Sequence, residues 1–210
     1  KFLREALTLA TLSRPVAESC IYAVPRDGKT IAGPSVRLAE ICASAYGNLH
    51  IAARIVDIEE KEIVAQGVAW DLEKNLRVTV ETRRRITSRN GRRFSDDMIT
   101  MTGNAAASIA LRNAIFRVCP RAYVDTIYAK VREVAVGDAK TLNARRHEVL
   151  SRLTKNGVPT ERVFAKLGKA AVEDIGLEDV ELLIGLGTAV KNGEVGIDDE
   201  IDFTMEVGYL

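Results

Sequence analysis

Three consecutive segments of the chain alternate apolar and polar residues in the way that β-strands do. They cover residues 49–58, 62–72 and 76–86, and short turns rich in Glu, Lys and Asn separate them. Parallel strands need a crossover of a dozen or more residues, so segments this close together pair as antiparallel neighbours. The sequence therefore predicts a three-stranded antiparallel β-meander.

The segment that follows the third strand predicts a long helix. Ser95 or Asp96 is a typical N-cap, and Pro120 ends the helix at about Cys119. Small residues are frequent in this helix and would let its backbone approach a sheet closely: Gly103, Ala105, Ala106, Ala107, Ser108, Ala110 and Ala114. Three strands followed by a helix that lies across them define an α+β fold.

The flanking segments predict further helices and a hairpin or a loop. Helical spacing is present at residues 2–12, 122–135 and 139–155. Pro25 and Asp27-Gly28 are turn signals that predict a hairpin or a loop over residues 20–32. Pro34 is expected at the first position of a helix that ends at Gly47.

The charge of the chain changes sign near residue 156, where Asn156 to Pro159 form the best candidate domain boundary. Residues 1–155 carry 26 basic and 17 acidic residues, whereas residues 156–210 carry four basic and twelve acidic ones. We expect a basic core over residues 1–155 and a small helical C-terminal domain over residues 156–210. A basic body with an acidic tail is typical of nucleic-acid-binding proteins, although two domains of different charge without that role would give the same pattern.

The positive charge of the core concentrates between Arg77 and Arg93. Glu81 is the single acid in this stretch, beside seven arginines: Arg77, Arg83, Arg84, Arg85, Arg89, Arg92 and Arg93. Alternation along the third strand predicts Arg77, Arg83 and Arg85 on one face and Arg84 on the other. Arginine binds phosphate through a planar, bidentate fork, whereas solubilising surfaces usually mix both signs of charge. The pattern favours a polyanion-binding surface, with a solvated strand face as the alternative.

A second group of arginines lies near the end of the predicted helix, at Arg112, Arg117 and Arg121. Further basic residues extend the positive region: Lys130, Arg132, Lys140, Arg145, Arg146 and Arg152. Few aromatic residues accompany the arginines, with Phe94 and Tyr123 near them. The composition therefore favours contact with a phosphate backbone over extensive stacking of bases.

No catalytic constellation is recognisable in the sequence. Asp27-Gly28-Lys29-Thr30 lacks the first glycine of a phosphate-binding loop, because Ala23 stands at that position. The pair Asp96-Asp97 is explained by its place at a helix N-terminus, where carboxylates complement the helix dipole. Gly185-Leu-Gly187 lacks the third glycine of a dinucleotide site and is interpreted as a helix irregularity.

The remaining reactive or aromatic side chains receive structural interpretations. His50 is expected in a structural role and Trp70 in the core, and Cys42 and Cys119 are expected to be buried. Cys20, Cys42 and Cys119 are too widely spaced for a disulfide framework, which favours a reducing, cytoplasmic location. No stretch approaches the ~18–20 apolar residues of a membrane span.

These observations predict a protein that is not an enzyme and needs no metal or cofactor. Two alternatives stay open. One is a metal-dependent nuclease or another DNA-processing enzyme, built from carboxylates distant in sequence. The other is an adaptor whose basic face meets an acidic protein surface.

Several segments resemble the single-strand annealing proteins of homologous recombination, which include the phage recombinases RecT and Red-beta. The resemblance is carried by the three-strand meander with its arginine-rich turn and by the segments AAASIALRNAIFRVCPRAYVD, IAGPSVRLAEICASAYGNL and VFAKLGKAAVEDIGLEDVELLIGLGTAVKNGE. Where the group often has Lys-Arg, this chain has Leu111-Arg112.

The resemblance implies a homo-oligomeric ring or filament that binds single-stranded DNA in a basic groove and anneals complementary strands without ATP. It implies that the groove is lined by Arg77, Arg83, Arg85, Arg89, Arg92 and Arg93, with Arg112 and Arg117 nearby. The acidic C-terminal region would then contact a host single-strand-binding or replication protein, or a neighbouring subunit.

Overall fold

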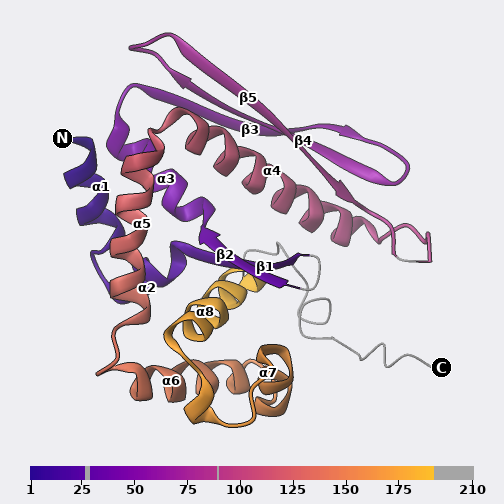
Figure 1. Cartoon of the computed structure of the whole chain (residues 1–210). Helices are drawn as coiled ribbons and strands as arrows, with labels where there is room; N and C mark the ends of the chain where they lie inside the picture. The colour runs from indigo at the N-terminus through magenta and orange to yellow at the C-terminus, as the bar shows by residue number, and fades with distance from the viewer. Residues whose placement is uncertain (27–28, 89, 192–210) are drawn as a thin grey trace.

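A three-stranded antiparallel sheet is the central element of the fold, as the sequence predicts. The computed structural model of the chain describes residues 1–26, 29–88 and 90–191 (Figure 1). The strands are β3 (Leu49–Ile58), β4 (Glu62–Asp71) and β5 (Leu76–Arg85), in the order β3-β4-β5. Figure 1 shows a long helix, α4, along one face of this sheet, and no described helix covers the other face. We call that uncovered face the outer face.

Helix α4 (Asp96–Val118) packs on the sheet through its small residues. Ser95 is its N-cap and accepts a hydrogen bond from the backbone N–H of Met98. The backbones of α4 and β4 meet at Gly67, where an added Cβ would lie only 2.3 Å from the carbonyl carbon and oxygen of Ala110. Any side chain at residue 67 would separate helix from sheet, so glycine is required there by close approach.

Before β3, the described residues form three helices and a hairpin. Its elements are α1 (Phe2–Ala10), α2 (Arg14–Ser19), β1 (Ile21–Arg26), β2 (Lys29–Pro34) and α3 (Val36–Tyr46). β1 and β2 pair in antiparallel register, so of the two predicted alternatives the segment forms the hairpin, while the Asp27-Gly28 turn lies outside the described residues. The expectation for Pro34 is wrong, because Pro34 ends β2 and Ser35 caps α3 by accepting a hydrogen bond from the Leu38 N–H.

Helices complete the chain beyond α4. They are α5 (Arg121–Val136), α6 (Leu142–Lys155), α7 (Thr160–Leu167), the 3-10 turn Val172–Asp174 and α8 (Leu177–Lys191). α8 runs through Gly185 and Gly187 without a break. Gly185 touches the hairpin, since an added Cβ would lie 2.6 Å from the backbone N of Ala23. Gly185 is therefore a packing position, and the interpretation as a helix irregularity is wrong.

The predicted domain boundary near residue 156 does not separate two buried clusters. Val124 and Ile127 of α5, before the boundary, belong to the same cluster of buried side chains as Ile175 and Val180, after it. The division into residues 1–155 and 156–210 remains a prediction from charge. Over the described residues, the two parts share one core.

The β4–β5 turn is organised by a buried carboxylate, Asp71. Its Oδ1 accepts hydrogen bonds from the backbone N–H groups of Glu73 and Lys74, both at 3.0 Å. Its Oδ2 accepts from the Tyr46 hydroxyl and the Lys74 ammonium, both at 2.9 Å. These donors, the Lys74 side chain first, hold the pKa of Asp71 well below its ordinary value.

Replacing Asp71 with asparagine should lower the thermal midpoint at pH 7 by several degrees. The folded-state pKa lies below the unfolded value of about 3.9, so the carboxylate stabilises the fold above that pH. The difference in thermal midpoint between wild type and Asp71→Asn should therefore become smaller as the pH falls below about 4. Thermal melts followed by circular dichroism at pH 7 and pH 3 measure this difference. Asp125→Asn, which removes an exposed ion pair with Arg121, is the control and should change little.

Candidate nucleic-acid interface

A row of arginines lies on the outer face of the sheet. Exposure alternates along β5, and Arg77, Arg83 and Arg85 are exposed together with Thr79 and Glu81 between them. The intervening residues turn toward α4, and Val80 among them is buried. The predicted placement of the three arginines on one strand face is thus confirmed.

The other arginines of the cluster are distributed differently. Arg84 is partly buried and pairs across the sheet with Ile63, on the face that α4 covers. Arg92 is exposed in the turn after β5, which is closed by a hydrogen bond of 2.8 Å from the Ser88 N–H to the Arg92 carbonyl. Arg89 lies outside the described residues.

Two arginines of the cluster bind the β3–β4 turn. The Arg83 guanidinium donates to a Glu59 carboxylate oxygen at 2.7 Å and lies 3.6 Å from a carboxylate oxygen of Glu62. Arg93 Nη1 donates to the backbone carbonyls of Glu59 and Glu60, at 3.1 and 2.8 Å. The Glu59 carboxylate raises the pKa of Arg83. Both arginines therefore help to hold this turn in place.

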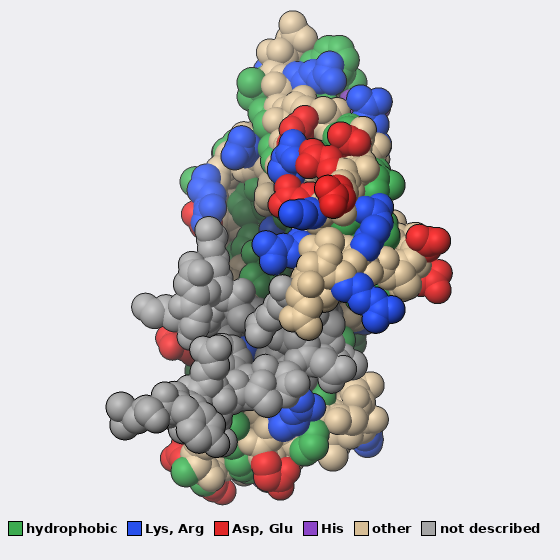
Figure 2. Space-filling view, turned by 90° about the vertical axis from the view of Figure 1, so that its right-hand side faces the viewer, with side chains coloured by type: hydrophobic (Ala, Val, Ile, Leu, Met, Phe, Trp, Pro, Cys, Tyr) green, Lys and Arg blue, Asp and Glu red, His purple; other side chains and the backbone are tan. Residues whose placement is uncertain are grey.

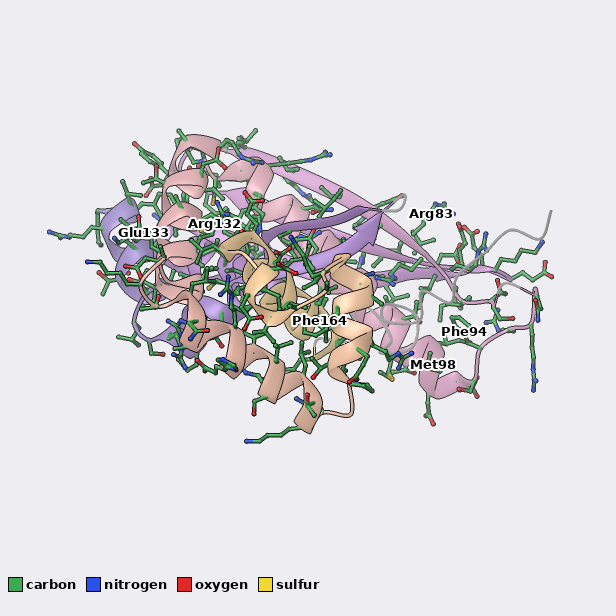
Figure 3. All side chains as sticks on the ribbon, turned by 60° about the horizontal axis from the view of Figure 1, so that its bottom comes forward. Arg83, Phe94, Met98, Arg132, Glu133 and Phe164 are labelled. Carbon is green, nitrogen blue, oxygen red and sulfur yellow. The ribbon has the colours of Figure 1, made fainter. Side chains whose placement is uncertain are left out.

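The acids of the β3–β4 turn reduce the positive charge at this end of the sheet. Figure 3 places Arg83 at the same end of the molecule as Phe94 and Met98, where the chain enters α4. Figure 2 faces this end and shows carboxylates gathered in its upper half, with Lys and Arg side chains around and below them. In the sequence, Glu81 is the single acid between Arg77 and Arg93. In the fold, Glu59 and Glu62 also lie beside the cluster, next to Arg83.

Arg112 does not belong to the exposed surface, contrary to the expectation of a place near the groove. Its residue exposure is 9%, and its guanidinium carbon lies 4.2 Å from the centroid of the Tyr22 ring. It therefore packs α4 against β1 through a cation–π contact. Arg112 is therefore not part of the exposed interface.

Arg117 and Arg121 lie in the helical layer rather than on the outer face of the sheet. Both are exposed, at the end of α4 and the start of α5. Arg121 Nε lies 2.7 Å from a carboxylate oxygen of Asp125, one turn further along α5. Because α4 covers the opposite face of the sheet, these two arginines do not extend the β5 row.

Several basic residues beyond residue 130 make contacts within the fold. Arg132 forms an ion pair with the buried Glu181 of α8. Arg146 donates to the backbone carbonyls of Glu173 and Ile175, both at 2.6 Å. Arg152 donates to Glu18 of α2 at 2.7 Å. The extended positive region predicted from sequence is thus partly used to join helices.

A hollow of about 320 Å³ opens on the outer face beside Trp70. Its lining includes His50 and Arg54 of β3, Val68 and Trp70 of β4, and Arg77 of β5. Trp70 is half-buried and His50 is exposed, so the expected core position of Trp70 is wrong. His50, Trp70 and Arg77 are aligned across the three strands. Pairing the three predicted strands in antiparallel register could have located this site from the sequence.

The cysteines do not offer a reactive thiol. Cys20, Cys42 and Cys119 are buried and free, and burial raises the pKa of each thiol to about 12. Over the described ranges, no group of three or more His, Cys, Asp and Glu side chains could hold a metal ion. No helix in the described part of the chain is both long and apolar enough to cross a membrane.

The fold and the site define an α+β protein with an arginine-bearing, uncovered sheet face. Comparisons of the chain with protein-family models, curated proteins and solved structures find no match.

Proposed function

We propose that this chain binds single-stranded DNA along the outer face of its sheet and anneals complementary strands without ATP. The observation that carries the proposal is the exposed row of Arg77, Arg83 and Arg85 on β5, with Arg92 also exposed in the turn after the strand. At about 3.3 Å per residue, Arg77 and Arg85 lie roughly 26 Å apart along the strand, so the row can contact several successive phosphates.

Binding to a single strand agrees with the open face of the sheet, on which Arg77, Arg83 and Arg85 are exposed. Side chains of a sheet face stand roughly perpendicular to it and can follow a flexible phosphate backbone. Annealing rests on the resemblance to single-strand annealing proteins, which hold single-stranded DNA in a basic groove and pair it with its complement without ATP.

The proposal includes a homo-oligomer. β3 and β5 are the two edges of the sheet, and β3 exposes apolar side chains at Ile55, Val56 and Ile58. An open edge strand with exposed apolar residues is suited to contact with another chain. The proposal also places the protein in the cytoplasm of a bacterial or phage-infected cell, where the acidic region after residue 156 contacts a host single-strand-binding or replication protein.

The proposed function predicts strong salt dependence of binding. Neutralising about four to six phosphates of a single strand gives a slope of about −3 to −4 for log K against log salt. Fluorescence anisotropy of a labelled oligo(dT) over a NaCl series measures this slope. Pairing of two complementary oligonucleotides, without nucleotide or Mg²⁺, measures annealing.

Three results would contradict the proposal. A flat salt response would exclude phosphate contact as the source of affinity, and no binding at low salt would favour an adaptor role instead. Cleavage of the oligonucleotide on addition of Mg²⁺ or Mn²⁺ would favour the nuclease.

A further inference from the structure

We propose that the hollow beside Trp70 holds an unpaired nucleobase stacked on the indole ring, with the adjacent phosphates on Arg54 and Arg77. The inference rests on the proposed function and deepens it. The outer face would then engage the bases of a single strand as well as its backbone.

The register of the strands creates the space for a base. Trp70 stands between His50 and Arg77 in one row across the sheet. The next row on the same face has the short side chains of Ala52, Val68 and Thr79. The large indole stands beside this row of small side chains, so a hollow remains above the row. The indole forms one wall of the hollow.

The indole is held in position from the turn. Its Nε1–H donates to the Asn75 side-chain oxygen at 3.3 Å. A tryptophan with its N–H partnered by its own chain does not need a ligand for hydrogen bonding, so the ring offers its apolar face. Base–aromatic stacking uses such a face, and it tolerates any base because every base has a π-surface.

The size and charge of the hollow fit a nucleotide. About 320 Å³ is at the small end of ligand pockets, which begin at about 300 Å³. Among the residues that the structure describes, those lining the hollow include Arg54 and Arg77 and no carboxylate. Arg77 pairs with Trp70 across the sheet, and Arg54 lies beyond the row of Ala52 and Val68. A cation therefore stands near each end of the hollow, as a planar base with a phosphate on each side requires.

Stacking on Trp70 requires a base that is not already stacked in a duplex. The hollow therefore favours single-stranded over double-stranded DNA of the same length. This preference would not follow from the arginine row alone, because phosphates are present in both forms.

Trp70 is the single tryptophan of the chain, so its fluorescence reports on this site directly. We expect oligo(dT) and oligo(dA) to quench the emission in proportion to the binding seen by anisotropy. An abasic oligomer of equal length should bind more weakly and leave the emission unchanged. Oligo(U) tests whether the site also accepts RNA.

Trp70→Ala should weaken oligo(dT) binding about tenfold or more, and Trp70→Phe should retain most of the affinity. Tyr123→Ala, which removes another half-exposed aromatic residue on α5, is the matched control and should leave binding unchanged. Thermal melts verify that each variant is folded. If Trp70→Ala does not fold, the comparison of wild type with Trp70→Phe and the abasic oligomer still tests the inference.

A failure of the base site can be distinguished from a failure of the proposed function. Salt-dependent oligo(dT) binding without quenching, or with equal quenching by the abasic oligomer, would overturn the base site and leave the proposed function standing. No binding of any oligonucleotide by anisotropy would overturn both.

Discussion

Replacing Gly67 with valine should lower the free energy of unfolding by about 3 kcal/mol. The new Cβ would lie 2.3 Å from the backbone of Ala110, and backbone atoms cannot move aside as a flexible side chain can. Helix α4 would have to leave the sheet, so the packing of Ala106 and Ala110 against Ile63 and Ala65 would be lost with it. Urea denaturation followed by circular dichroism measures the change, with the m-value as a check that unfolding stays two-state.

Gly187 offers the matched control, because it lies in α8 and an added Cβ would meet nothing within 4 Å. Gly187→Ala should raise the stability by up to about 1 kcal/mol, since alanine has the higher helix propensity. Equal midpoints for wild type and Gly67→Val would show that α4 does not lie on β4 as described.

Removing Arg77, Arg85 and Arg92 together, each to alanine, should weaken single-stranded DNA binding roughly 100-fold at low salt. We assume that each exposed arginine contributes about 1 kcal/mol through one phosphate contact. The salt slope should also become shallower by about 2, because three fewer phosphates are neutralised. Anisotropy titrations over a NaCl series give both numbers, and the melting temperature should stay the same because all three side chains are exposed.

A control triple variant separates position from net charge. Arg4, Arg37 and Lys130 are exposed on α1, α3 and α5, and replacing them with alanine removes the same charge from other surfaces. This variant should lose little affinity. Equal losses in the two triple variants would mean that net charge, and not the outer face, determines binding.

Glu59→Gln should have the opposite effect on binding. It removes the charge of the carboxylate that accepts the 2.7 Å hydrogen bond from Arg83, so the guanidinium, with Glu62 still 3.6 Å away, is less strongly held and turns more easily to a phosphate. We expect a few-fold gain in affinity at low salt. A loss would indicate that holding the β3–β4 turn matters more than freeing Arg83.

Most of the fold could be predicted from local patterns. Period-two alternation with short turns predicts β3, β4 and β5, and a cap, a run of small residues and Pro120 predict α4. These features depend on residues close in sequence, because strand alternation and helix capping are local. The placement of Arg77, Arg83 and Arg85 on one face follows in the same way.

The burial of Trp70 could not be predicted because β4 carries apolar residues on both faces. Ile63 and Ala69 are buried on the α4 side, while Val68 and Trp70 lie on the outer side. Alternation separates two such faces without telling which one a helix will cover. Once α4 lies against Gly67, the face with Trp70 is the one left open.

By itself, the sequence determined the strands, the long helix and the arginine row of this protein, because each is set by neighbours along the chain. Only the tertiary structure decided which arginines remain exposed and free of contacts within the fold that would compete with a phosphate. It brings Glu59 of the β3–β4 turn and Glu62 of β4 to Arg83, and it buries Arg112 on Tyr22 between α4 and β1. Ion pairs and cation–π contacts act over a few ångströms, so they depend on what the fold brings together and not on spacing in the sequence.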